Sequence, residues 1–130
     1  MKNKRIDSFV TFERSIMKNM FLFCENEHID TIKQQYNNSI VTDREFTGVG
    51  FYTNFYVADK SLHLKDNVNF EIGGIHASIN GLKSGAGFIV FIRNGVIKCL
   101  EGYTYGEPWP KEITEYKFSI VKKDGSLIDL

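Results

Sequence analysis

The sequence predicts an α+β fold, in which N-terminal helices pack on a curved, mainly antiparallel sheet of about five to seven strands. Apolar residues recur at three- and four-residue steps before residue 37, as in helices, and at every second residue after residue 40, as in strands. The dipeptide Asn94-Gly95 separates two strand-like segments within residues 85–105. Both residues tolerate positive φ, so the pair predicts a β-hairpin turn.

The length of 130 residues is that of a single domain, residues 1–130. Sixteen basic and sixteen acidic residues cancel, and no basic stripe is present, so nucleic acid is not an expected partner. The longest uncharged apolar segment, 85–92, is far shorter than the roughly 20 residues that span a bilayer. Without a signal peptide, and with Cys24 and Cys99 expected to be reduced, the chain is predicted to be cytoplasmic.

Two helices are expected in the first third of the chain. The first buries one face made of Phe9, Phe12, Ile16 and Met20. Ser8 could cap this helix, and residues 21–24 could either end it or form a short strand. The second follows Asn26 and carries an apolar stripe of Ile29, Ile32 and Tyr36.

Alternation with a period of two begins after these helices. It predicts a strand at 49–57, with a partner strand at 40–46 joined to it through Thr47-Gly48. The polar segment 58–67 is expected to be a loop. In the next strand, 68–79, the parity changes at Gly73-Gly74, which predicts a β-bulge or a sharp bend.

The strand at 86–93 has apolar residues on both faces, which indicates a central strand that is covered on both sides. A loop at 81–85 leads into it, and the strand at 96–105 follows the hairpin turn. Further strands are predicted at 116–121 and, after an Asp124-Gly125 turn, at 126–130.

A two-residue turn fixes a register for the hairpin, with Ile92 opposite Ile97. Counting outward, this register sets Gly87 beside Gly102 and leaves a flat patch without side chains. A core helix, a ligand, a partner protein or simply a bend in the sheet could account for such a patch.

The same register puts Glu101 beside Phe88, where an unpaired charge would cost several kcal/mol if it were buried. We expect Glu101 to be paired, protonated or at a wet edge. One hypothesis is a binding cleft lined by Glu101, Tyr103 and Tyr105 and closed by Trp109, which Pro108 and Pro110 stiffen. The alternatives are a purely structural role for Glu101 and a lid over the core for Trp109.

His76 lies in a predicted strand and could meet Glu101. The three histidines and two cysteines have no metal-ligand spacing, and no nucleophile motif is present. The sequence therefore predicts no metal, no cofactor and no catalytic residue. The candidate binding residues are Glu101, Tyr103, Tyr105, Trp109, His76, Gly87 and Gly102.

Three segments resemble a group of small bacterial proteins of unestablished function: residues 44–51 (REFTGVGF), 53–55 (TNF) and 100–110 (LEGYTYGEPWP). The resemblance spans roughly residues 27–120 and leaves out the first helix. The chain is also similar in size and character to immunity-type proteins, which neutralise secreted toxins. This likeness implies a partner protein but assigns no residue a role.

Two kinds of function follow. The first is a non-catalytic binding protein, in which tyrosines and the tryptophan anchor another protein. The second is a small-molecule-binding or enzymatic domain, in which Glu101 and His76 would form an acid–base pair. Free sheet edges could also support a homo-oligomer, although nothing in the sequence indicates one.

Overall fold

Two helices precede a seven-stranded antiparallel sheet in the computed structural model, which describes residues 4–130. This arrangement confirms the predicted α+β class. The helices are α1 (Lys4–Phe23) and α2 (Ile29–Asn37). The strands are β1 (Ile40–Phe46), β2 (Gly50–Tyr56), β3 (Phe70–Ile79), β4 (Ala86–Arg93), β5 (Val96–Thr104), β6 (Tyr116–Val121) and β7 (Leu127–Asp129).

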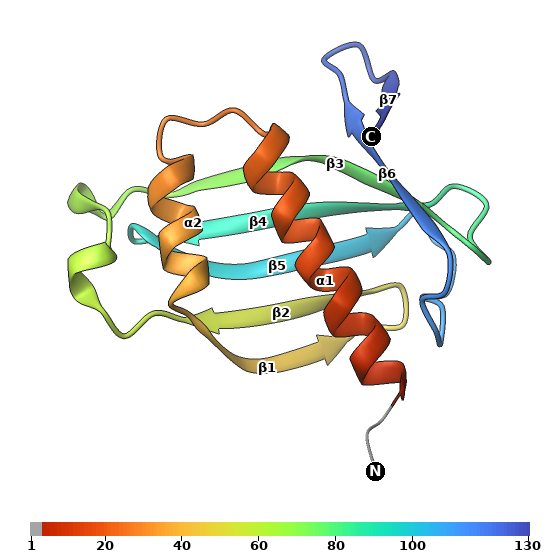
Figure 1. Ribbon diagram of the computed structural model, residues 1–130, viewed down its shortest axis with the longest axis horizontal. Helices are drawn as coiled ribbons and strands as arrows, with labels where there is room; N and C mark the ends of the chain where they lie inside the picture. Colours follow the sequence, from red (N-terminus) through yellow and green to blue (C-terminus); the bar gives the residue numbers. More distant parts are fainter. Residues whose placement is uncertain (1–3) are drawn as a thin grey trace.

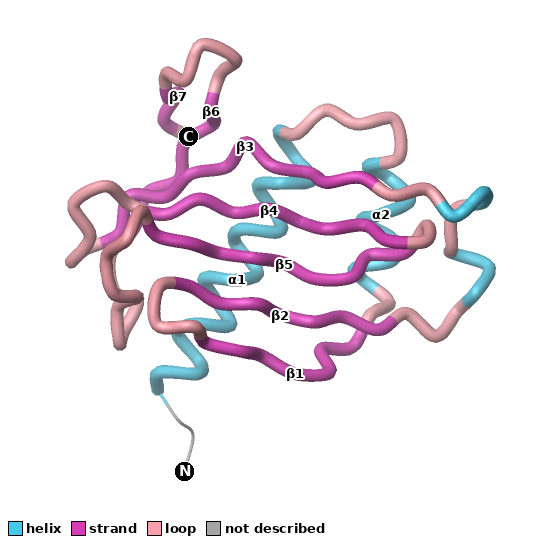
Figure 2. The backbone as a smooth tube through the Cα atoms, turned by 180° about the vertical axis from the view of Figure 1, so that it is seen from behind, coloured by secondary structure: helices cyan, strands magenta, loops and turns pink. Residues whose placement is uncertain are grey.

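The strand order across the sheet is β1-β2-β5-β4-β3-β6-β7, so β4 is the central strand. Both helices lie across the same face of the sheet (Figure 1), and the view from behind shows the other face uncovered (Figure 2). The prediction that β4 is covered on both sides is therefore wrong. Its apolar residues Ile89 and Phe91 are only partly buried, on the uncovered face, which we call the open face.

Helix α1 buries the predicted face, since Phe9, Phe12, Ile16 and Met20 are at most 4% exposed. The ring of Phe12 lies at the centre of the core and contacts Phe88 and Tyr116 at centroid distances of 5.7 and 4.8 Å. The helix begins at Lys4, so Ser8 lies within it and the predicted cap is wrong. The apolar period did not reveal this first turn because the turn is mostly charged. Residues 21–23 continue the helix rather than forming a strand.

Helix α2 is fixed by a buried amide that the apolar pattern did not reveal. Gln35 is fully buried, and its Nε2 donates to the carbonyls of Leu62 and Gly95 at 2.8 and 2.9 Å. Its Oε1 accepts a hydrogen bond from the Ile97 amide at 2.7 Å. One side chain thus joins α2, the segment after β2 and the β4–β5 turn. Glutamine is usually a surface residue, so sequence alone gave no reason to expect this.

The strands lie close to their predicted positions. The β1–β2 hairpin turns where Thr47-Gly48 predicts, and β3 has an irregular register between Ile72 and Ile75, which confirms the bulge at Gly73-Gly74. Residues 58–67 contain two short 3₁₀ turns, Lys60–Leu62 and Lys65–Asn67, within the predicted loop. The last strand, β7, pairs with β6.

The β4–β5 hairpin turns at Asn94-Gly95 as predicted, and both residues have positive φ. Ile92 faces Ile97, also as predicted. Beyond that pair the register shifts by one residue, so that Phe91 faces Cys99. The register predicted for the remainder of the hairpin is therefore wrong, and the open-face side chains of β5 differ from those expected.

Candidate functional site

The shifted register places Glu101 on the open face, opposite Ile89 instead of Phe88. Across the sheet, Glu101 also faces Tyr52 of β2, which in turn faces Glu45 of β1. One row of the open face thus reads carboxylate, phenol, carboxylate, aliphatic from β1 to β4. The predicted contact of Glu101 with Phe88 is wrong because Phe88 lies on the helix side.

Glu101 is partly buried and is paired with a phenol rather than with a cation. The Tyr52 hydroxyl donates to its Oε2 at 3.0 Å. This hydrogen bond is the main reason that the pKa of Tyr52 is raised, and the negative charge of Glu101 is the next. Among residue 6 and residues 8–130, no lysine or arginine forms an ion pair with Glu101 or Glu45. The row is therefore acidic, and none of the described lysine or arginine side chains is paired with it.

The pairing of Tyr52 with Glu101 predicts a measurable pH dependence. Since the pKa of Tyr52 is raised in the folded chain, the stabilisation from this pair is complete below the unfolded tyrosine pKa of about 10. It is lost as the pH rises through the higher folded value. We expect Glu101→Gln to lower the Tyr52 pKa, measured by the NMR shift of its Cζ. Glu27→Gln is the control, and equal Tyr52 pKa values in both variants would contradict the pairing.

Tyr103 occupies the position where a bare glycine patch was predicted. It faces Gly87 across the β4–β5 ladder, and its ring lies over that glycine. A Cβ built on Gly87 would stand 2.5 Å from the Tyr103 hydroxyl oxygen. Gly87 permits a close approach to its backbone, and the group that makes this approach is the Tyr103 side chain of the same sheet.

Gly102 lies on the helix side of the sheet, opposite Phe88. A Cβ at Gly102 would stand 2.2 Å from Cε1 of Phe51, so this glycine makes room for a core ring. Gly87 and Gly102 are therefore not side by side, and the predicted flat patch is wrong. The extra residue in β5 separates them to opposite faces.

His76, Tyr103 and Tyr105 form an aromatic cluster at one end of the open face. Ring centroids of Tyr103 and Tyr105 are 5.8 Å apart, and those of Tyr105 and His76 are 6.4 Å apart. The Nε2 of His76 lies 3.0 Å from the Ser84 carbonyl oxygen, so this nitrogen is the donor. His76 shares a row with Gly87 and Tyr103, whereas Glu101 lies in the next row, and the two do not form the expected pair.

Trp109 lies on the helix side, away from Glu101. Its indole packs against Phe51 and Phe12 at centroid distances of 5.2 and 6.4 Å, and its amide donates to the Gly48 carbonyl at 2.7 Å. The predicted cleft lined by Glu101 and closed by Trp109 is therefore wrong. The alternative, in which Trp109 covers the core, describes its position.

The structure thus divides the seven candidate residues into two groups. Five lie on the open face: Glu101, Tyr103, Tyr105, His76 and Gly87. Gly102 and Trp109 lie on the helix side. The binding roles of all seven residues stay a prediction.

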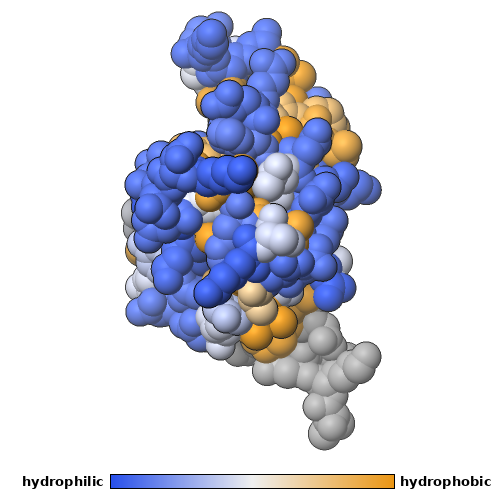
Figure 3. Space-filling model, turned by 90° about the vertical axis from the view of Figure 1, so that its left-hand side faces the viewer, coloured by the Kyte–Doolittle hydropathy of each residue, from blue (hydrophilic) through white to orange (hydrophobic). Residues whose placement is uncertain are grey.

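Sequence reasoning assigned Ile89 and Phe91 to the core, and the structure adds them to the open face. The guanidinium of Arg93 lies 5.2 Å from the Phe91 ring centroid and forms an ion pair with Glu71 at 2.9 Å. Near the Asn94-Gly95 turn, the end of the molecule is mostly hydrophilic (Figure 3). The available signal was that β4 has apolar residues on both faces, but this pattern does not say which face a helix covers.

Comparisons with protein families, curated proteins and solved structures found no match. No helix among residues 4–130 is both long and apolar enough to cross a bilayer.

Proposed function

We propose that this chain is a non-catalytic, cytoplasmic binding protein of the immunity type, which holds a partner protein on the open face of its sheet. The observation that carries the proposal is the set of partly buried or exposed aromatic and aliphatic side chains of this face, on a sheet whose other face is packed by helices. They are Tyr52, Ile89, Phe91, Tyr103 and Tyr105. Tyrosine is enriched among the residues that anchor protein interfaces.

The charge of the open face indicates the chemistry of the partner. Glu45 and Glu101 flank Tyr52, and no cation among the described side chains, residue 6 and residues 8–130, is paired with them. A lysine or arginine of a partner would supply the missing charge, and a guanidinium could also stack on the tyrosine rings. The partner is therefore a protein with a basic contact surface.

The alternative function, a small-molecule or enzymatic pocket around Glu101, Tyr103 and Tyr105, requires Glu101 and His76 to point into one cavity. His76 is bonded to Ser84, and Glu101 is bonded to Tyr52 in another row. This arrangement favours a binding surface over an acid–base pair.

Affinity capture with matched variants tests the proposal. The parent chain and two open-face variants, Ile89→Ser and Glu101→Arg, are used as bait in cytosol of the native cell. Leu22→Ser and Glu27→Arg are the controls, since both positions are exposed on the helix side. Any protein recovered by the parent is then purified and titrated against each variant by calorimetry.

We expect both open-face variants to weaken the dissociation constant at least about tenfold, as for interface anchors, and both controls to change it less than about twofold. Recovery of a toxin-like partner with a basic surface would support the proposed immunity function. If the parent and both open-face variants bind the recovered protein with equal affinity, the open face is not the interface.

A further inference from the structure

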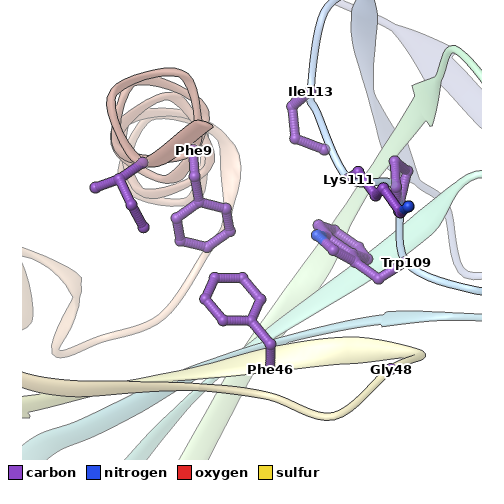
Figure 4. Close-up of a pocket in the computed structure, with 8 residues that line it drawn as sticks. Phe9, Phe46, Gly48, Trp109, Lys111 and Ile113 are labelled. Atoms are coloured by element: carbon purple, nitrogen blue, oxygen red, sulfur yellow. The ribbon is translucent and has the colours of Figure 1, made fainter. Parts of the chain in front are cut away.

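A second candidate site lies on the helix side, independent of the open face. It is a cavity of about 340 Å³ where the start of α1, the β1–β2 turn and residues 109–113 meet (Figure 4). We call it the Trp109 pocket. The side chains that define it are Ile6, Phe9, Phe46, Trp109, Lys111 and Ile113. Its volume is at the lower end of the range for small-molecule sites, about 300–1,000 Å³.

The walls of the Trp109 pocket are fixed by contacts that do not involve a ligand. Phe9 packs edge-to-face on Phe46 and on Phe51, with centroids 5.2 and 4.8 Å apart. The hydrogen bond from the Trp109 amide to Gly48 holds the 109–113 segment against the β1–β2 turn. A Cβ built on Gly48 would meet no atom within 4 Å, so the turn leaves the space open. The pocket is therefore preformed, which lowers the cost of binding.

Apolar surface remains in water around this pocket. Phe46 is 49% exposed and Ile6 is 41% exposed, although Phe9 and Ile113 beside them are almost fully buried. Val49, at the end of the β1–β2 turn, is 46% exposed. Contiguous exposed apolar groups around a hollow are typical of a binding site, because a ligand that covers them removes their surface from water.

The polar groups of the pocket favour a negative charge on the ligand. Among the lining residues whose side chains the structure describes, Lys111 is the one that carries a charge. The indole N–H of Trp109 has no hydrogen-bond partner among residue 6 and residues 8–130, and Figure 4 shows its nitrogen at the ring edge that faces Phe9 and Phe46. An ammonium and a free N–H are both donors, and a carboxylate is an acceptor with no hydrogen to donate.

We propose that the Trp109 pocket binds a small amphipathic carboxylate. A short alkyl chain or a single ring lies between Phe46 and Trp109, and the carboxylate is held by Lys111. This site lies across the sheet from Glu101, so the proposal does not depend on the open face binding a protein.

NMR titration of the isotope-labelled chain with three probes of equal chain length tests the proposal. The probes are octanoate, 1-octanol and octylammonium. The chain has a single tryptophan, so the indole N–H gives one cross-peak that reports on the pocket directly. We expect octanoate to shift this cross-peak and the Gly48 amide saturably. The affinity for 1-octanol should be about fivefold weaker, the effect of losing a surface ion pair, and that for octylammonium weaker still.

Two variants with matched controls separate the contribution of the Lys111 charge to affinity from the contribution of the apolar contacts. Lys111→Gln should weaken octanoate about fivefold and leave 1-octanol unchanged, whereas Lys117→Gln, at an exposed lysine of β6, should change neither. Phe46→Ala should weaken both probes, whereas Tyr56→Ala, at an aromatic residue that is 56% exposed, should not. The remaining amide cross-peaks check that each variant is folded.

Each result decides one part of the proposal. Absence of a saturable shift of the Trp109 indole cross-peak overturns the site itself. Equal affinity for octanoate and 1-octanol, or an octanoate affinity that Lys111→Gln leaves unchanged, overturns the assignment of an anionic ligand.

Discussion

Glu13→Ala should lower the free energy of unfolding by about 3 kcal/mol, the lower end of the range for removing one partner of a buried ion pair. Glu13 of α1 is 3% exposed. Its carboxylate receives two hydrogen bonds from the Arg44 guanidinium, at 2.8 and 3.1 Å, and one from the Thr53 hydroxyl at 2.5 Å. The substitution leaves these donors without their acceptor. Water can reach Arg44, whose side chain is 22% exposed, so we expect the lower end of the range.

Urea denaturation of the parent and the variant measures this effect. Glu45→Ala is the matched control, since Glu45 is the neighbour of Arg44 on β1 but is exposed, and it should change stability by less than about 0.5 kcal/mol. A double-mutant cycle with Arg44→Ala isolates the energy of the pair. If Glu13→Ala costs no more than Glu45→Ala, the buried ion pair does not hold α1 to the edge of the sheet.

Gly102→Ala should destabilise the chain by about 2–3 kcal/mol through overpacking of the core. The added Cβ would stand 2.2 Å from a carbon of the Phe51 ring. Phe51 cannot swing away, because it is fully buried and packs against Phe9 and Trp109 at centroid distances of 4.8 and 5.2 Å. Gly102 does not have positive φ, so the added methyl group meets the ring without backbone strain.

The matched control is Gly73→Ala in β3, another strand glycine without positive φ. A Cβ there would meet its nearest atom at 3.7 Å, an ordinary contact. We expect Gly73→Ala to be neutral or stabilising by about 0.5 kcal/mol, since alanine loses less entropy than glycine on folding. In a Gly102→Ala chain, Phe51→Leu should recover part of the loss. Equal unfolding free energies for the two alanine variants would contradict the close approach of Phe51.

The strands, the bulge and the hairpin turn could be predicted because they depend on residues that are neighbours in the chain. An alternating apolar period defines β2, a continuous apolar segment defines β4, and the change of parity at Gly73-Gly74 defines an extra residue in β3. Asn94-Gly95 defines the turn through the positive φ that both residues adopt.

The composition of the candidate site could not be predicted in the same way. The Ile97 amide, beside the register shift of β5, donates to Gln35, 62 residues earlier in the chain. A shift of one residue exchanges the two faces of a strand. It therefore brings Glu101 to the open face beside Tyr52 and turns Gly102 toward Phe51.

The sequence by itself thus determined the class of the fold, the positions of its strands and the sharp turns between them, because periodicity and backbone φ are local properties. Only the tertiary structure decided which face of the sheet the helices cover. It also decided which side chains of β5 point to the covered face and which to the open face. Likewise, it decided that Trp109 packs against Phe51 in the core rather than lying beside Glu101. These outcomes depend on contacts between distant segments, of which the local apolar pattern carries no record.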